Sequence, residues 1–122
     1  MPWQYAQKTG QLKIGGVTVS VGYSGKKGLG RNDPSKENIQ AVGPIPKGRY
    51  RIGKPYEHAS KGPVTMALAP IGHTALGRTH FLIHGDGVKN PGDASEGCIV
   101  LDRKTREAIA KSDDTELVVI EK

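Results

Sequence analysis

The chain has 122 residues, which suits one domain of ordinary size, and its formal net charge is +6. A single cysteine excludes an intramolecular disulfide bond, and the absence of an apolar run of about 18 residues excludes a membrane-spanning helix. With 17 glycines and 8 prolines, the composition favours a β-rich fold with many turns over a helical bundle.

The first third of the chain predicts a hairpin followed by a long loop. Apolar residues alternate through Leu12–Ile14 and Val17–Tyr23, and Gly15-Gly16 lies between them. Two glycines at this place indicate a tight hairpin, because both can adopt positive φ. Residues Ser24–Val42 are polar and glycine-rich, which is typical of a binding loop. Asp33-Pro34 predicts one helical turn within it, since proline suits the first helical position.

Short strands dominate the middle of the chain. A turn rich in glycine and proline runs from Gly43 to Gly48. Apolar and β-branched residues beyond it predict three strands, at Arg49–Ile52, Val64–Ala69 and His80–His84.

The last third predicts a loop, two strands and a helix. Residues 85–92 form the loop, and Ile99–Leu101 is a short buried strand. Asp102 can cap a helix over Arg103–Lys111, because its carboxylate can accept free amides of the first turn. Glu116–Ile120 closes the chain as a strand. The prediction is a mostly β domain covering residues 1–122, with one short helix after the cysteine strand.

The only cysteine stands in a pattern that suits nucleophilic catalysis. Cys98 follows the strand-end His84 by fourteen residues, and a hairpin-like connection of this length can bring a strand-end histidine beside a strand-start cysteine. An imidazole can remove the proton of a thiol, which is mostly protonated at neutral pH with a pKa of about 8.5. Gly97 allows a substrate to approach closely, and the amides of Gly97 and Cys98 can face a developing oxyanion. A lone cysteine is also compatible with an inert core residue.

Three segments resemble the YkuD-type L,D-transpeptidase family. Ser95-Glu96-Gly97-Cys98-Ile99 resembles its Ser/Thr-His-Gly-Cys signature, and Phe81–Gly85 resembles its strand ending in His-Gly. Gly43–Tyr50 is similar to its Thr-Pro-x-Gly-x-Phe turn and strand. This resemblance implies a sandwich- or barrel-like β fold that acts on peptidoglycan stem peptides. It implies Cys98 as nucleophile and His84 as base.

Two further segments resemble one branch of that family, the small L,D-transpeptidase-like toxins of bacterial type VI secretion. They are Trp3-Gln4-Tyr5 with Gly22–Gly25, and the site sequence Ala94–Cys98. The branch implies an antibacterial toxin that cleaves or exchanges the terminal D-Ala of tetrapeptide stems. It also implies a cognate immunity protein and a component of the secretion apparatus as partners.

The site departs from the family pattern at two positions. Glu96 stands where the main family has a second histidine, and Val100 stands where it has an arginine thought to hold a stem carboxylate. We expect another arginine to take that role, and the sequence leaves three candidates open, Arg78, Arg31 and Arg103.

Several other residues are expected to support the site. Gly85, Ser95 and Glu96 are candidates for shaping the turns around the cysteine and histidine. Asp86 can orient the imidazole, as can a backbone carbonyl, and loop aspartates are also common turn formers. The toxin branch often has an asparagine three positions after the histidine. This chain has Gly87 at that position, and Asn90 is a candidate to take the role of the asparagine.

No cofactor is implied and no metal site is expected. His80 and His84 have the i, i+4 spacing of a helical zinc site, but on a strand they lie about 13 Å apart. The N-terminus lacks the apolar segment of a secretory signal, so we expect export by a route other than Sec and action in the periplasm of a target bacterium.

Two other classes of function compete with this reading. Papain-like and NlpC/P60 peptidases also pair cysteine with histidine, but there the cysteine precedes the histidine in the chain. A basic, non-catalytic module that binds peptidoglycan or nucleic acid fits the charge of +6. It is opposed by the scattered placement of the lysines and arginines and by the absence of exposed aromatic ladders.

Overall fold

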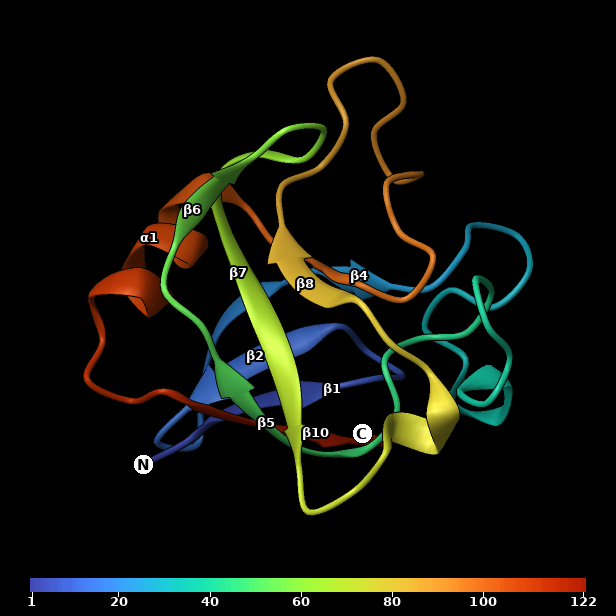
Figure 1. The fold of residues 1–122 in the computed structure, drawn as a ribbon, viewed down its shortest axis with the longest axis horizontal. Coiled ribbons are helices and arrows are strands. Elements are labelled where there is room, and N and C mark those ends of the chain that lie inside the picture. Colours follow the sequence, from blue (N-terminus) through green and yellow to red (C-terminus); the bar gives the residue numbers. More distant parts are fainter.

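The computed structural model describes residues 1–122 and shows one mixed β-sheet that nearly closes on itself (Figure 1). The strands follow each other through the sheet in the order β3-β2-β1-β10-β5-β7-β8-β9-β4, and β6 pairs with β7 alone. Their bounds are Trp3–Ala6 (β1), Gln11–Ile14 (β2), Val17–Val21 (β3), Tyr23–Ser24 (β4), Gly48–Ile52 (β5), Tyr56–His58 (β6), Gly62–Ile71 (β7), Phe81–His84 (β8), Ile99–Val100 (β9) and Glu116–Ile120 (β10). The mostly β, barrel-like fold predicted from the sequence is confirmed.

The two ends of the sheet come together where β3 continues into β4. The two strands stand at opposite ends of the strand order but are separated in the chain only by Gly22. The Gly22 amide donates to the Gly10 carbonyl at 2.8 Å. A Cβ on Gly22 would lie 2.0 Å from the Val100 carbonyl oxygen, so the close approach of these segments requires glycine.

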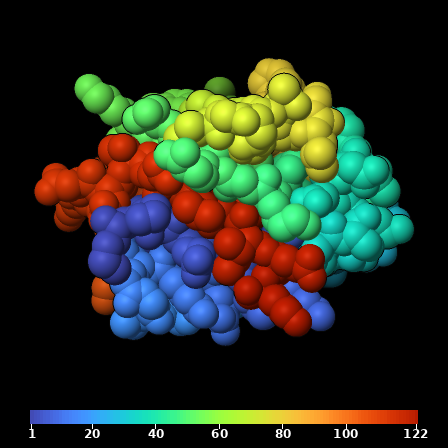
Figure 2. Space-filling model, turned by 90° about the horizontal axis from the view of Figure 1, so that it is seen from below, coloured from blue at the N-terminus to red at the C-terminus, as the bar shows by residue number.

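The ends of the chain meet in the sheet. β1 pairs in parallel with β10, in the register Trp3↔Leu117 and Tyr5↔Val119, and these four side chains are buried. Figure 2 shows the N-terminal and C-terminal residues lying against each other, as this pairing requires. β1 and the short β6 were not predicted from the sequence. The predicted strand Val17–Tyr23 is divided at Gly22.

The predicted local elements are confirmed elsewhere. Gly15 and Gly16, with φ of 59° and 79°, form the turn between β2 and β3. Pro34–Lys36 is a 3-10 turn within the long loop, and a second short one lies at Ala75–Gly77. The helix α1 spans Arg103–Lys111, as predicted.

α1 packs against β7 on the outside of the sheet, and its buried residues are Thr105, Arg106 and Ile109. The hydrophobic core is a cluster of 16 buried apolar residues, among them Tyr5, Leu12, Tyr50, Met66, Ile83 and Leu117, and it includes Ile109 of α1. No helix in the structure combines the length and the apolar character that a bilayer crossing needs.

Asp102 caps α1 through a hydrogen bond from the Thr105 amide to its carboxylate at 3.1 Å. We predict that Asp102→Ala lowers the free energy of unfolding by about 1 kcal/mol, since one amide of the first turn loses its partner. Asp102→Ser, which can still accept that hydrogen bond, should retain most of the stability. Urea denaturation of the three proteins measures the difference, and equal stability of Asp102→Ala and the unaltered protein would contradict the role of the cap.

Candidate active site

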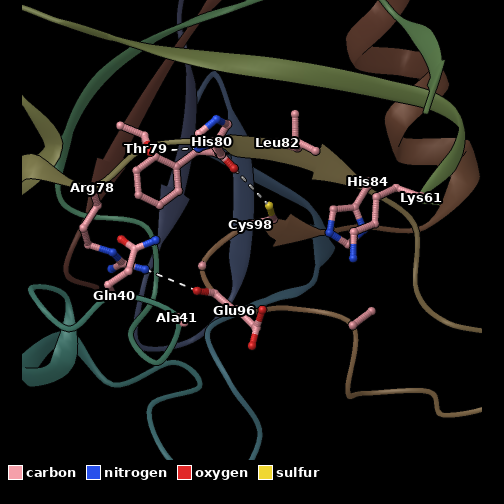
Figure 3. A pocket seen from close by; sticks show the side chains of 13 residues that line it. Gln40, Ala41, Lys61, Arg78, Thr79, His80, Leu82, His84, Glu96 and Cys98 are labelled. Atoms are coloured by element: carbon pink, nitrogen blue, oxygen red, sulfur yellow. Dashed lines mark hydrogen bonds between the residues drawn. The ribbon is translucent and has the colours of Figure 1, made fainter. Parts of the chain in front are cut away.

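A pocket of about 240 Å³ lies over the end of β8, and the single cysteine is one of the residues that line it (Figure 3). Its lining includes Lys61, Arg78, His84, Glu96 and Cys98. These residues come from segments far apart in the chain: the β6–β7 turn, the residues before β8, the end of β8 and the loop before β9.

The parallel pairing of β8 with β9 brings the cysteine and histidine to the same face of the sheet. Ile83 pairs with Ile99, and both side chains are fully buried in the core. Neighbouring residues on a strand point to opposite faces, so His84 and Cys98 face away from that core and toward the pocket. The predicted hairpin-like connection is wrong, because β8 and β9 run parallel and a hairpin joins antiparallel strands. His84 and Cys98 nevertheless line the same pocket.

The thiol of Cys98 is directed at a backbone carbonyl. Its Sγ lies 3.7 Å from the His80 oxygen and can donate a weak hydrogen bond to it. Burial raises the pKa of Cys98 above its usual range, against the opposing effects of the Leu82 backbone and the positive charges of Lys61 and Arg78. The resting thiol is therefore protonated at neutral pH, and no hydrogen bond joins it to His84 in this structure.

His84 is held in one tautomer by its own neighbour in the chain. Its Nδ1 lies 2.8 Å from the Gly85 carbonyl oxygen, which can only accept, so Nδ1 carries the proton. Nε2 is buried and has no hydrogen-bond partner. Burial also lowers the pKa of His84, so the imidazole is neutral at pH 7. The result is an unoccupied proton acceptor in the same pocket as the thiol.

Asp86 lies outside the pocket and organises the loop between His84 and Cys98. Its carboxylate accepts a hydrogen bond from the Tyr23 hydroxyl at 2.6 Å and from the amide of Gly92 at 3.0 Å. The Tyr23 oxygen in turn accepts from the Ala94 amide at 3.0 Å. Of the two imidazole-orienting groups that the sequence left open, the geometry favours the backbone carbonyl of Gly85.

Ser95 closes the turn that presents Cys98. Its hydroxyl donates to the Cys98 carbonyl at 2.6 Å and accepts from the amides of Gly25 and Gly97 at 2.9 and 3.1 Å. The Gly97 amide is thus occupied, which leaves Cys98 as the remaining amide of the predicted oxyanion pair. Ser24 supports the same turn, since its hydroxyl donates to the Gly97 carbonyl at 2.9 Å.

Arg78 lines the pocket, but its guanidinium is used for support. Nη1 donates to the carbonyls of Glu37 and Pro44 at 2.6 and 2.8 Å, and Nη2 to those of Gly43 and Glu96 at 3.1 and 3.3 Å. A Cβ at Gly97, where φ is +143°, would lie 2.5 Å from Nη2. The guanidinium therefore joins the long loop to the turn before Cys98.

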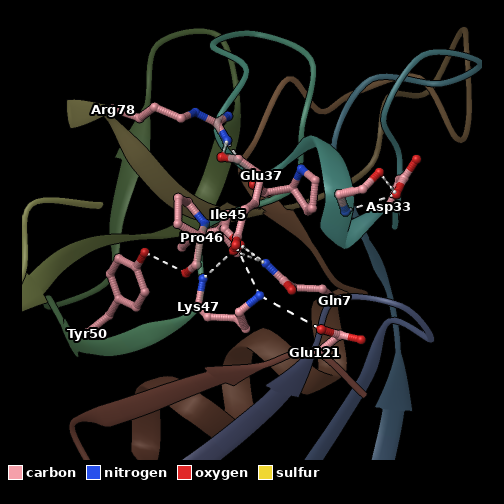
Figure 4. A network of polar contacts seen from close by, with 11 residues as sticks. Gln7, Asp33, Glu37, Ile45, Pro46, Lys47, Tyr50, Arg78 and Glu121 are labelled. Carbon is pink, nitrogen blue, oxygen red and sulfur yellow. Dashed lines mark hydrogen bonds and ion pairs between the residues drawn. The ribbon is translucent and has the colours of Figure 1, made fainter. Parts of the chain in front are cut away.

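Glu37 anchors the long loop from the other side (Figure 4). Its carboxylate accepts hydrogen bonds from the Gln7 side chain at 2.9 Å and from the amide and ammonium of Lys47 at 3.0 Å. Burial alone favours the protonated acid, but these hydrogen bonds outweigh it, so the pKa of Glu37 lies below its usual value. The loop that carries Gln40 and Ala41 to the pocket is thereby fixed at its base.

The remaining predicted residues fall into two groups. Glu96 lines the pocket with an exposed side chain, and its carboxylate lies 3.9 Å from the Lys26 ammonium. Asn90, Arg31 and Arg103 do not line it. Lys61 was missed by the sequence analysis because a lysine in a turn, 23 residues before His84, carries no local signal of a site.

A family model described as the Tlde1 domain matches residues 18–121 of the chain. The matched range contains β3 apart from Val17, all of β4 to β10, and every residue of the pocket described above. No curated protein matches the chain.

We predict that Arg78→Met destabilises the protein, because four backbone carbonyls lose their donor. Each carbonyl that stays shielded from water costs about 1–3 kcal/mol. Arg51→Met is the matched control, since Arg51 is exposed on β5 and its side chain makes no hydrogen bond. Urea denaturation should show a clear loss of unfolding free energy for Arg78→Met and little change for Arg51→Met. Equal stability of the two variants would contradict the stabilising role of Arg78.

The raised pKa of Cys98 predicts slow alkylation at neutral pH. The thiolate fraction grows as pH rises, so the rate with iodoacetamide should increase through a midpoint above about 8.5. N-acetylcysteine under the same conditions is the reference thiol. Fast alkylation at pH 6 to 7 that disappears in His84→Gln would instead show a resting thiolate–imidazolium pair.

Proposed function

The chain belongs to the Tlde1 domain family, the type VI secretion effectors of L,D-transpeptidase type, and on that premise we propose that it cleaves or exchanges the terminal D-Ala of peptidoglycan tetrapeptide stems. One observation carries the proposal. The only thiol of the chain shares a pocket with a buried, neutral imidazole whose Nε2 has no partner.

In the proposed first step, Cys98 is the nucleophile and His84 the general base. Rotation of the thiol away from the His80 carbonyl brings Sγ toward the free Nε2, which takes its proton. The sulfur attacks the carbonyl of the bond between the third residue and D-Ala. The Cys98 amide is the candidate donor to the oxyanion.

In the second half of the reaction, His84 returns the proton to the nitrogen of D-Ala as the carbon–nitrogen bond breaks. D-Ala leaves and a thioester to Cys98 remains. Water then releases a tripeptide, or the amine of another stem or of a free D-amino acid forms a new amide. Either attacker loses its proton to Nε2, and Nε2 passes that proton to Sγ as the carbon–sulfur bond breaks, which restores the starting state.

Family membership implies delivery by a type VI secretion system, a peptidoglycan substrate and an immunity partner. We propose that the protein acts in the periplasm of the target cell, where that substrate lies. The net charge of +6 favours an acidic contact face on the immunity protein, because opposite potentials speed association.

The chemistry is tested with purified disaccharide tetrapeptides and mass spectrometry, with and without added D-methionine. We predict loss of D-Ala, or its replacement by D-methionine, and no activity for Cys98→Ala. His84→Gln, which keeps most of the buried volume, should lower turnover about 10²- to 10⁴-fold. Circular dichroism confirms that each variant is folded. Full activity of a folded Cys98→Ala or His84→Gln protein would remove that residue from the mechanism.

The site of action is tested by expression in a bacterial host. Toxicity should require an added periplasmic signal peptide and should be absent for Cys98→Ala carrying the same signal. Killing from the cytoplasm by both forms would contradict the proposal and favour the nucleic-acid-binding alternative.

A further inference from the structure

We propose that the ammonium group of Lys61 binds the terminal carboxylate of the stem peptide, an inference that rests on the proposed function. An enzyme that acts on the last peptide bond meets a carboxylate one carbon beyond the leaving nitrogen. That negative group must therefore lie within a few ångströms of Cys98 and His84. A carboxylate in such a pocket needs a cationic or hydrogen-bonding partner.

Besides the histidines, two basic residues line the pocket, Arg78 and Lys61. Arg78 is 5% exposed, and both of its Nη atoms already donate to backbone carbonyls. Lys61 is exposed and forms no ion pair. Its side chain is drawn on the same side of Cys98 as the His84 ring (Figure 3). Lys61 is therefore the lining cation that is free to meet a ligand.

The other cations that the sequence suggested are engaged away from the pocket. Arg31 donates to the Gly92 carbonyl at 2.9 Å and lies over the Tyr23 ring at 4.8 Å. Arg103 is bonded to Glu107 at 3.3 Å within α1. Neither of these arginines lines the pocket.

The turn that carries Lys61 is fixed at its tip. The His58 ring accepts hydrogen bonds at Nδ1 from the amides of Ser60 and Lys61, both at 3.1 Å. The Lys61 backbone is thus anchored while its ammonium stays free.

The base of the same turn is tied to α1. Arg106 donates from Nη1 to the carbonyls of Pro63 and Val64 at 2.7 and 3.2 Å. The same arginine packs so closely on Gly85 that a Cβ there would lie 2.7 Å from Nη2. The buried Arg106 therefore contacts both the turn that carries Lys61 and Gly85, whose carbonyl orients His84.

The distribution of charge in the pocket also favours a substrate carboxylate beside Lys61. Glu96 is the acidic residue of the lining, and Figure 3 shows it on another side of Cys98 from Lys61. A carboxylate near Glu96 would be repelled, whereas one near Lys61 is attracted. The two charges thus favour one orientation of the stem in the pocket.

The test varies the charge at position 61 of the enzyme and the charge at the C-terminus of the substrate independently. Disaccharide tetrapeptides with a free or an amidated C-terminus are given to the unaltered protein, Lys61→Met, Lys61→Arg and Lys104→Met. Lys104 is exposed on α1, forms no ion pair and does not line the pocket, so its variant controls for net charge.

We expect the unaltered protein and Lys104→Met to prefer the free acid by about tenfold in kcat/KM. Lys61→Met should lose that preference because its kcat/KM falls for the free acid and not for the amidated substrate. Lys61→Arg should keep most of the preference. A lysine that only favoured the thiolate would slow both substrates equally. Unchanged preference in Lys61→Met, or equal loss on both substrates, would overturn the proposal.

Binding to inactive protein separates this inference from the proposed function. Cys98→Ala and the double variant Cys98→Ala/Lys61→Met are titrated with both tetrapeptides by calorimetry. Tighter binding of the acid that requires Lys61 supports the carboxylate site even if D-Ala is never released. Release of D-Ala together with acid binding that ignores Lys61 would reject Lys61 and leave the proposed function intact.

Discussion

The guanidinium of Arg78 is the interaction on which the pocket depends. It is buried without a carboxylate partner, and its charge is met by four backbone carbonyls from the long loop, the turn at Gly43 and Pro44, and the residue before Gly97. None of these segments belongs to the sheet, so the strands alone do not fix their positions. A buried charge that is hydrogen-bonded to several carbonyls is costly to disturb. These hydrogen bonds therefore fix the positions of the loops around the pocket, as the strand pairing fixes the sheet.

Burial also sets the electrostatic state of Cys98 and His84. It lowers the pKa of His84 and raises that of Cys98, so the neutral thiol and neutral imidazole are favoured over the ion pair. In the proposed mechanism, proton transfer therefore belongs to the attack step, as in general-base catalysis, and is not completed beforehand. The fixed tautomer matters for this reason, because the hydrogen bond from Nδ1 to Gly85 leaves Nε2 as the acceptor.

The sequence predicted what depends on local patterns. The paired glycines at the β2–β3 turn, the Asp102 cap and the valine-rich segment of β10 each act over a few residues, and all three were found. β1 was missed because its pairing with β10 joins opposite ends of the chain. The role of Arg78 was missed for a related reason, since its partners are carbonyls that every residue type provides. The His84–Cys98 arrangement was accessible because both residue types carry the chemistry themselves.

The departure at Val100 connects the fold to the proposed carboxylate site. Related enzymes of the wider family have an arginine there, on the same face of the strand as the cysteine. Here Val100 is 3% exposed and pairs with Tyr23, close to where the sheet closes through Gly22. Val100 does not line the pocket of Cys98; it lines a separate hollow with Asp86 and Asp102, whose carboxylates would attract an arginine placed here away from that pocket. A cation serving the pocket therefore has to come from outside the strand. The β6–β7 turn fits that requirement, because Arg106 fixes it from the helix while the ammonium of Lys61 stays in solvent until a substrate arrives.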